Sequence, residues 1–282
     1  MRIDRISDQI YTFISDLYVQ AAATVVLTSE GAVVIDTLPF PAETRQILDF
    51  CHRQLGPRSV RYLVLTHHHP DHVYGAYLFA EAQVIAHHRC LELLESQGAA
   101  SLARAKAQTP ALDDVDLRLP DMVFSEELHL HLGDQHIELM HLPGHTSDGI
   151  GGFVHGERVF IASDAMMPVP HIVGGDVGQL KSSLRRIRDA KPSFVVQGHG
   201  DVLLKGEVNE TVQASIAYLD KAMAVVQEVI TEQRSPRTLR QMDIETFGLS
   251  RIPLDGAVNQ LHLANLIWLY KELSGRAVGQ PR

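Results

Sequence analysis

The spacing of apolar residues alternates between two patterns over the first two hundred positions. Short runs rich in β-branched and aromatic residues predict strands, and apolar residues three or four positions apart predict helices. Proline suits the first turn of a helix, where its missing N–H is not needed, so Pro41 marks a helix start. We predict strands at 10–14, 23–28, 32–35, 61–65, 83–86, 127–132, 136–142, 149–154, 158–161 and 194–197, and helices at 41–55, from about 73, at about 89–108 and at 180–190.

These elements form two successive halves, each with strands followed by helices. This order favours two sheets packed together and covered by helices. The pattern changes at about 207, where an amphipathic helix is predicted at 207–232 and a second helix at 258–273. We therefore divide the chain into a main domain, residues 1–206, and a C-terminal helical extension, residues 207–282, packed on the same domain. The extension is either a cap or a dimerisation element, which leaves a homodimer open.

The composition is that of a globular protein and excludes some partners. Apolar residues make up 45% of the 282 positions, and no run approaches the ~18 apolar residues of a membrane-spanning helix. The N-terminus has no apolar signal region, and Cys51 and Cys90 are too few for a disulfide framework. We therefore expect a cytoplasmic protein without a membrane partner. The net charge of −9 argues against nucleic-acid binding, which normally needs a basic face.

A dense cluster of ligand-type side chains follows the predicted strand at 61–65. It comprises His67, His69, Asp71 and His72. Side chains alternate along extended backbone, so His67 and His69 point to one side and His68 points to the other. Asp71 and His72 can reach the same pocket as the chain turns into a helix. Zinc, manganese and iron accept imidazole and carboxylate ligands, so the cluster predicts a metal site rather than a histidine-rich polar loop.

Three more ligand-type residues follow at the ends of later predicted strands. They are His145, Asp164 and His199. Pro143 and Gly144 shape a tight turn before His145, and the glycines on both sides of His199 allow backbone and ligand to approach closely. Residues at strand ends lie on loops that can converge on one site. These positions give part of the chain's set of 16 histidines a common explanation.

These motifs, together with Val34-Ile35-Asp36-Thr37, resemble those of the metallo-β-lactamase-fold hydrolases over about residues 10–201. The resemblance implies an α/β (α+β) fold, a four-layer αβ/βα sandwich with the site at one edge, here carrying the C-terminal helical extension. In that fold Asp36 would support the metal-binding loop without binding a metal itself. The implied ligands are His67, His69 and His145 for one metal, Asp71, His72 and His199 for the other, and Asp164 as the bridge.

The ligand set is similar to that of the dinuclear branch with glyoxalase II, lactonases and phosphodiesterases. Antibiotic-hydrolysing members tend to carry Cys or Ser where this chain has Asp164, and the flavodiiron branch has a glutamate where it has His69. Ser163 stands where glycine is common before the bridging aspartate, which is a small departure. The resemblance implies two divalent metal ions, with Zn²⁺ preferred and Mn²⁺ or Fe²⁺ as alternatives.

The function implied by this branch is hydrolysis of an ester, thioester or lactone of a small molecule by a metal-bridging hydroxide. Two cations about 3.5–4 Å apart lower the pKa of a shared water and stabilise the developing oxyanion. Asp71 is the candidate catalytic residue, because it could also steer that water or accept its proton. Tyr74 and His171 are candidates for the substrate pocket. Eight further histidines are assigned to surfaces or polar contacts: 68, 87, 88, 129, 131, 136, 141 and 155.

Three alternatives stay open from the sequence. Phosphodiester cleavage is the second interpretation within the hydrolases. A persulfide dioxygenase-like oxidoreductase would share the fold but use a single iron. A scaffold protein that kept the fold without catalysis is the non-enzymatic alternative, and the intact set of ligands argues against it.

Overall fold

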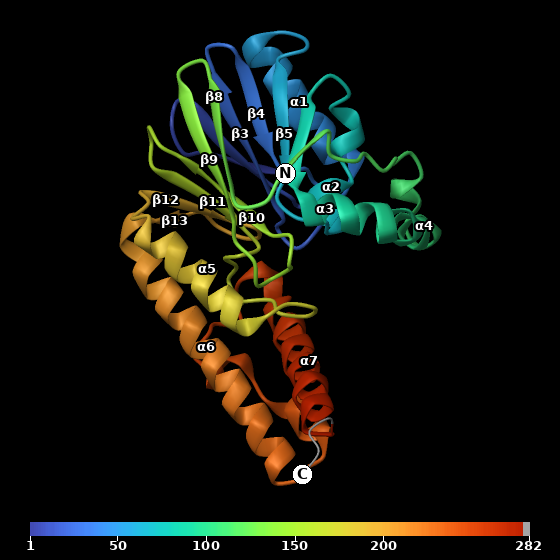
Figure 1. Ribbon diagram of the computed structural model, residues 1–282, viewed down its shortest axis with the longest axis vertical. Coiled ribbons are helices and arrows are strands. Elements are labelled where there is room, and N and C mark those ends of the chain that lie inside the picture. Colours follow the sequence, from blue (N-terminus) through green and yellow to red (C-terminus); the bar gives the residue numbers. More distant parts are fainter. Residues whose placement is uncertain (279–282) are drawn as a thin grey trace.

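The structure, a computed structural model, describes residues 1–278 and consists of two β-sheets packed face to face with helices on both outer sides (Figure 1). The strand order is β1-β2-β3-β4-β5-β6-β7 in the first sheet and β13-β12-β11-β10-β9-β8 in the second. The layers run helix, sheet, sheet, helix. The predicted four-layer αβ/βα sandwich is therefore confirmed.

The first sheet contains the N-terminal strands of the chain. Neighbouring strands are antiparallel from β1 to β4 and parallel from β4 to β7. Its strands are β1 Arg2–Arg5, β2 Ile10–Ile14, β3 Ala22–Thr28, β4 Gly31–Ile35, β5 Val60–Leu65, β6 Gln83–His87 and β7 Met122–Phe124. Helix α1 (Pro41–Leu55) covers its outer face, where it buries Ile47 and Phe50.

The second sheet is antiparallel except for the β11–β12 pair. Its strands are β8 Glu127–Leu132, β9 Gln135–His141, β10 Ile150–Val154, β11 Val159–Ser163, β12 Phe194–Gln197 and β13 Leu203–Leu204. Helices α5 (Val177–Asp189), α6 (Lys205–Thr231) and α7 (Val258–Val278) lie on its outer side and extend away from the first sheet (Figure 1). Apolar residues of all three helices share one core with this sheet, among them Leu184, Leu219 and Leu266.

A separate apolar core lies between the sheets and holds their relative position. Ile35 and Val64 from the first sheet pack there with Leu139 and Ile161 from the second. The central strands are buried on both faces, which explains why they read as nearly continuous apolar runs rather than alternating ones. The packing of this core fixes the position of the strand ends of one sheet relative to those of the other.

Several elements differ from the sequence predictions. The short strands β1, β7 and β13 were not predicted, because two to four residues carry too little pattern. The helix predicted from about Val73 is the single turn α2 (Pro70–Val73), which begins earlier because Pro70 fits the first helical position. Short 3₁₀ turns at Ala76–Leu78 and Pro110–Leu112 flank the next elements.

The helix predicted at about 89–108 is divided into three segments. Helix α3 (His88–Leu93) and helix α4 (Ala99–Gln108) are separated by a π-turn at Leu94–Gly98. Hydrophobic spacing does not distinguish a π-turn from continuous helix, so the interruption had no signal in the sequence.

The C-terminal part of the chain begins with α6 at Lys205, close to the predicted change of pattern. Three 3₁₀ turns, at Pro236–Gln241, Ile244–Phe247 and Leu254–Gly256, connect α6 to α7. The division into residues 1–206 and 207–282 stays an interpretation, since α6 and α7 pack into the same core as the second sheet. Among residues 1–278, no helix combines the length and the apolar character needed to cross a membrane.

Candidate metal centre

Strand ends from both sheets place the seven predicted ligands at one edge of the molecule. His67 follows the end of β5, Asp164 follows the end of β11, and His199 follows the end of β12. A β-bridge between Ala21 and His199 ties the two sheets together at this point. The turn before His145 requires glycine, because Gly144 has φ +137° and a Cβ there would collide with the backbone of Leu180. All seven are buried except His69, which is partly exposed.

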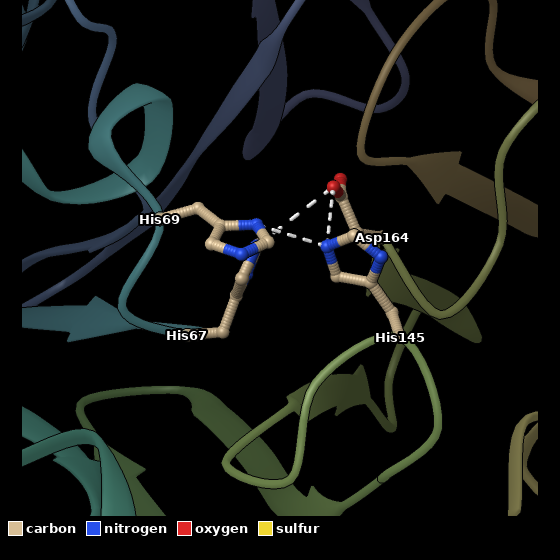
Figure 2. A group of neighbouring side chains, drawn as sticks. All are labelled: His67, His69, His145 and Asp164. Atoms are coloured by element: carbon tan, nitrogen blue, oxygen red, sulfur yellow. Dashed lines mark hydrogen bonds and ion pairs between the residues drawn. The ribbon is translucent and has the colours of Figure 1, made fainter. Parts of the chain in front are cut away.

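The first group of ligand atoms brings together His67, His69, His145 and Asp164 (Figure 2). Their candidate ligand atoms all lie within 4.8 Å of one another. Nε2 of His145 lies 3.0 Å from Nδ1 of His69 and 3.2 Å from Oδ2 of Asp164. Nε2 of His67 lies 3.8 Å from the same carboxylate oxygen. Three imidazole nitrogens and one carboxylate oxygen therefore surround a common point.

The second group contains Asp71, His72 and His199, again with ligand atoms within 4.8 Å of one another. Nε2 of His199 lies 3.2 Å from Oδ2 of Asp71. The other carboxylate oxygen of Asp164, Oδ1, lies 3.4 Å from Nε2 of His72 and 3.6 Å from Nε2 of His199. Asp164 thus directs one oxygen at each group, which is the arrangement of a carboxylate that bridges two cations.

The donor atoms of both groups fit metal ions. Nε2 of His67, Nε2 of His72 and Oδ1 of Asp164 are buried and have no hydrogen-bond partner among the described residues. A buried polar atom without a partner costs free energy, so such atoms need an explanation. Imidazole nitrogens and carboxylate oxygens are ligands of Zn²⁺, Mn²⁺ and Fe²⁺. Two divalent cations would satisfy all three atoms.

Hydrogen bonds on the far side of the rings orient four of the histidines. Nδ1 of His72 lies 2.8 Å from Oδ2 of Asp36, and Nδ1 of His67 lies 3.1 Å from Oγ1 of Thr66. Nδ1 of His199 donates to the carbonyl of Val19, and Nδ1 of His145 donates to the carbonyl of His171, both at 2.8 Å. A carbonyl only accepts, so Nδ1 carries the proton in the last two rings and Nε2 is free to bind a metal.

Asp36 connects the ligand loop of the first sheet to the second sheet. Besides its contact with His72, it accepts hydrogen bonds from the N–H and the hydroxyl of Thr66, both at 2.7 Å, and from Ser163 at 3.1 Å. Asp36 has φ +63° and Ser163 has φ +46°, a conformation that non-glycine residues rarely adopt. Position 163 is often glycine in the family, and the serine found here adds a hydroxyl that donates a hydrogen bond to Asp36.

Burial and mutual charge set the protonation of the ligands. Burial and the neighbouring histidines together lower the pKa of His69 to about 3 and that of His67 well below its usual range. Burial alone would raise the pKa of Asp164, but His199, His72 and His145 hold it well below its usual range. Burial alone would lower the pKa values of His72 and His199, but Asp36, Asp71 and Asp164 raise that of His72, and Asp164 and Asp71 raise that of His199. Imidazoles bind cations in the neutral form, so cations in the second group would displace protons from these two rings.

The two predicted pocket residues both lie near the centre. Tyr74 follows α2, is buried, and lines a pocket that also includes His69. The ring of His171 lies 5.6 Å from that of His145, and burial lowers the pKa of His171 to about 4, with His145 as the next cause. Their contacts with substrate stay predictions.

The structure adds supporting residues that sequence reasoning missed. His68, assigned to polar contacts, has Nδ1 3.0 Å from Oδ1 of the fully buried Asp148, which also accepts the backbone N–H of His68 at 2.8 Å. Asp148 lies three residues after His145, so its place in the same loop could have identified it as a supporting residue from the sequence. Thr66 and the Val19 carbonyl had no such signal. Val19 has φ +43°, which a β-branched residue adopts only under constraint.

The other histidines lie outside the centre. His131, His136 and His155 stack on one another across β8, β9 and the end of β10, with ring centroids 4.3 and 4.2 Å apart. His87 is buried and stacks on His141. These positions agree with the predicted polar and surface roles.

Comparison with known proteins identifies the family. Residues 18–199 match the sequence profile of the Metallo-beta-lactamase superfamily. The chain belongs to this superfamily. It is 30% identical over 162 residues to a hydroxyacylglutathione hydrolase, GloC, of Haemophilus influenzae, a match that covers 53% of this chain and 73% of that protein. It is 22% identical over 158 residues to a Beta-lactamase-like protein 2 homolog of Caenorhabditis elegans, covering 49% of this chain and 52% of the relative.

A solved structure shows the same fold. The metallo-beta-lactamase from Pontibacter korlensis superposes with a TM-score of 0.61 at 19% identity, over 75% of this chain and 97% of that chain. The family and the similarity to a hydroxyacylglutathione hydrolase indicate a metal-dependent hydrolase, as the ligand motifs predicted. The chain matches only about half the length of the Caenorhabditis relative, so the substrate is a separate question.

Proposed function

We propose that this chain is a dinuclear metal-dependent hydrolase that cleaves an ester, thioester or lactone of a small molecule. One observation carries the dinuclear part of the proposal. The two oxygens of Asp164 lie at 3.2 Å from His145 and at 3.4 Å from His72, and each of these histidines belongs to a different ligand group. A site for one metal would not need the second group.

The proposed ligands are those of the sequence prediction, with His67, His69 and His145 for one cation and Asp71, His72 and His199 for the other. Two divalent cations held there, with Zn²⁺ as the first choice, supply an activated water and positive charge for an oxyanion on the substrate. Asp36, Thr66 and the carbonyls of Val19 and His171 fix the histidine rings beforehand, which lowers the cost of reorganisation during the reaction.

Asp71 is the proposed proton acceptor. Burial would raise its pKa, but His72 and His199 hold it below the usual range, so the carboxylate is ionised at neutral pH. Its Oδ2 lies 3.2 Å from Nε2 of His199 and 3.7 Å from Nε2 of His72, inside the second ligand group. From there it can orient the attacking water and accept its proton.

The similarity to a hydroxyacylglutathione hydrolase supports a thioester as the first substrate class to test. An acylated thiol has a carbonyl carbon that can be attacked and a thiolate that leaves readily. Phosphodiester cleavage is the second candidate within the fold. The complete second ligand group favours two cations over the single iron of a persulfide dioxygenase.

The test is a substrate panel assayed with the metal-loaded chain. It contains a hydroxyacylglutathione, a phenyl ester, a γ-lactone, a phosphodiester and a persulfide. Turnover of the persulfide is measured as oxygen uptake. We expect turnover of a carbonyl substrate, lost by at least about 10³-fold in Asp164→Asn, since removal of a metal-centre group costs several kcal/mol of transition-state stabilisation. His131→Ala, a histidine substitution on the surface of β8, is the matched control and should retain full activity.

Three other outcomes of this assay would contradict the proposal. Phosphodiesterase activity without carbonyl hydrolysis would replace the proposal by the second candidate. Oxygen uptake with a persulfide would indicate the dioxygenase. Full activity in Asp164→Asn, with the fold confirmed by circular dichroism, would remove the proposed mechanism.

A further inference from the structure

A pocket beside the metal centre extends towards the helices that follow β6. His69, a proposed metal ligand, lies at one end of this pocket, and residues from α2, α3, the π-turn and α4 complete its walls. Its position places one end of any bound molecule next to the proposed reaction centre. Figure 1 shows α4 projecting from the body of the first sheet on this side.

The walls of the pocket differ in character along its length. Val73 and Leu94 form an apolar wall, and both are at most 2% exposed. Tyr74, Ser101 and Arg104 supply two hydroxyls and a guanidinium. The pocket therefore combines a metal-ligand end, an apolar wall and a polar, cationic part, which is the usual composition of a small-molecule site.

Tyr74 provides an independent indication of a ligand. Its side chain is 4% exposed, and its hydroxyl makes no hydrogen bond of good geometry in the part of the chain that the structure describes. Burial raises the pKa of Tyr74, and the nearby Ser101 hydroxyl and Arg104 guanidinium act to lower it, so the hydroxyl faces the polar part of the pocket. A buried tyrosine hydroxyl normally finds a partner, because leaving it unsatisfied costs free energy. A polar group on a molecule bound in the pocket would provide one.

The π-turn is a second indication. The turn at Leu94–Gly98 brings Leu94, Gln97 and Gly98 to the pocket wall, whereas an uninterrupted helix would present a different set of side chains. Gly98 packs closely against the facing loop, because a Cβ there would lie 2.7 Å from Cδ2 of Leu117 and would push that side chain aside. π-turns within helices are frequent at functional sites, where they redirect side chains.

Arg104 adds a positive charge to the lining of the pocket. It is exposed, it lies on α4, and it contributes a permanent positive charge to a chain whose net charge is −9. A carboxylate is the group that a guanidinium binds with two parallel hydrogen bonds. A neutral apolar ligand would leave both this charge and the Tyr74 hydroxyl unused.

We propose that this pocket binds the acyl group of the substrate, and that the acyl group is a short apolar chain ending in a carboxylate. The proposal rests on the proposed hydrolase function and names its substrate class as monoesters or monothioesters of dicarboxylic acids. The scissile carbonyl lies at the His69 end, the methylene groups lie against Val73 and Leu94, and the distal carboxylate contacts Arg104 and Tyr74.

The first test compares two thioesters of equal chain length. Adipoyl and hexanoyl thioesters of one thiol differ only in whether the chain ends in a carboxylate or a methyl group. We expect the wild-type chain to prefer the adipoyl thioester in kcat/KM by at least about 10-fold, as charge-assisted hydrogen bonds allow. Arg104→Gln should lower kcat/KM for adipoyl by about 10- to 100-fold, mainly through KM, and leave hexanoyl within about threefold.

Two further variants complete that comparison. Tyr74→Phe should lose about 3- to 10-fold with the adipoyl thioester only. Arg53→Gln replaces an exposed arginine of α1 outside the pocket and should behave as wild type with both substrates. Equal loss with both substrates in Arg104→Gln, or no preference for adipoyl in the wild type, would overturn the assignment of the pocket.

A binding experiment separates this inference from the proposed function. Adipate and hexanoate are titrated calorimetrically into the metal-loaded protein, so that one carboxylate is common to both ligands. Tighter binding of adipate that Arg104→Gln abolishes would support the pocket even if no carbonyl substrate is hydrolysed. Equal affinities for the two acids would contradict the pocket, even if ester hydrolysis is observed.

Discussion

His145 donates its Nδ1–H to the backbone carbonyl of His171 at 2.8 Å, which links a proposed metal ligand to the loop after β11. Helix α7 holds this loop in place. Oδ1 of Asn265 accepts the N–H of Ile172 at 3.0 Å, and its Nδ2 donates to the carbonyl of Pro170 at 2.6 Å. The C-terminal helix therefore fixes the residues on both sides of His171 and, through them, the orientation of a ligand ring.

Replacing Asn265 by alanine should therefore weaken the metal centre from a distance. We expect metal affinity to fall by about 10- to 100-fold, the usual effect of losing a group that orients a ligand, as measured by chelator competition. Tyr218→Phe is the control, because it removes a hydroxyl that contacts Asn265 and His262 but leaves both loop hydrogen bonds intact. Wild-type metal affinity in Asn265→Ala, or an equal loss in Tyr218→Phe, would contradict this role.

Ser163 should respond differently to alanine and to glycine. Both substitutions remove the hydroxyl that contacts Asp36 and Thr66, but only glycine also relieves the positive φ of +46°. We expect Ser163→Ala to lower the free energy of unfolding by about 1–3 kcal/mol and Ser163→Gly by about 1 kcal/mol less. Urea denaturation of the metal-loaded protein measures both. A larger loss with glycine than with alanine would show that backbone strain is not important there.

His87 should make the protein less stable as the pH falls. Its Nδ1 accepts the N–H of Arg89, and its Nε2 donates to the carbonyl of Ser125, so both nitrogens are used in the neutral ring. Burial and the neighbouring His141 together lower the pKa of His87 to about 4. In the unfolded chain the ring binds a proton below about 6.5, and in the folded chain only below about 4. The unfolded state therefore gains protons first, and stability falls between these two values.

Substitution of His87 by asparagine should remove this titration, because asparagine can still accept the N–H of Arg89 at the start of α3. Between pH 7.5 and pH 5, we expect the wild type to lose about 1–2 kcal/mol more unfolding free energy than His87→Asn. Chemical denaturation at the two pH values gives this difference. Identical pH dependence in both proteins would show that His87 is not held neutral by the fold.

The clustering of the proposed ligands could be predicted from the sequence because its signal is local. Histidines and aspartates stand directly after apolar strands, and the strand ends of a two-sheet fold converge on one edge. His67 and His69 needed only the alternation of side chains along extended backbone to be assigned to one side. The packing of the sheets then brings these separate strand ends to the same place.

The supporting contacts could not be predicted, since they depend on distant backbone. Asn265 holds a loop 93 and 95 residues away in the sequence, and His199 donates to the carbonyl of Val19, 180 residues away. Backbone carbonyls carry no residue-specific signal. The π-turn at Leu94–Gly98 was missed because the hydrophobic spacing on either side is that of a helix. Of the pocket that it shapes, the sequence indicated Tyr74 but not the wall residues of the π-turn and α4.

The central claim is that Asp164 joins two separate cation sites, and counting metal ions per chain tests it most directly. The protein is purified without a metal-affinity tag, loaded with Zn²⁺, freed of excess ion and measured by elemental analysis. We predict two ions per wild-type chain, one ion in His199→Ala, which removes a ligand of the second group only, and two ions in the surface control His131→Ala. A single ion per wild-type chain, or an unchanged count of two in His199→Ala, would contradict the dinuclear account.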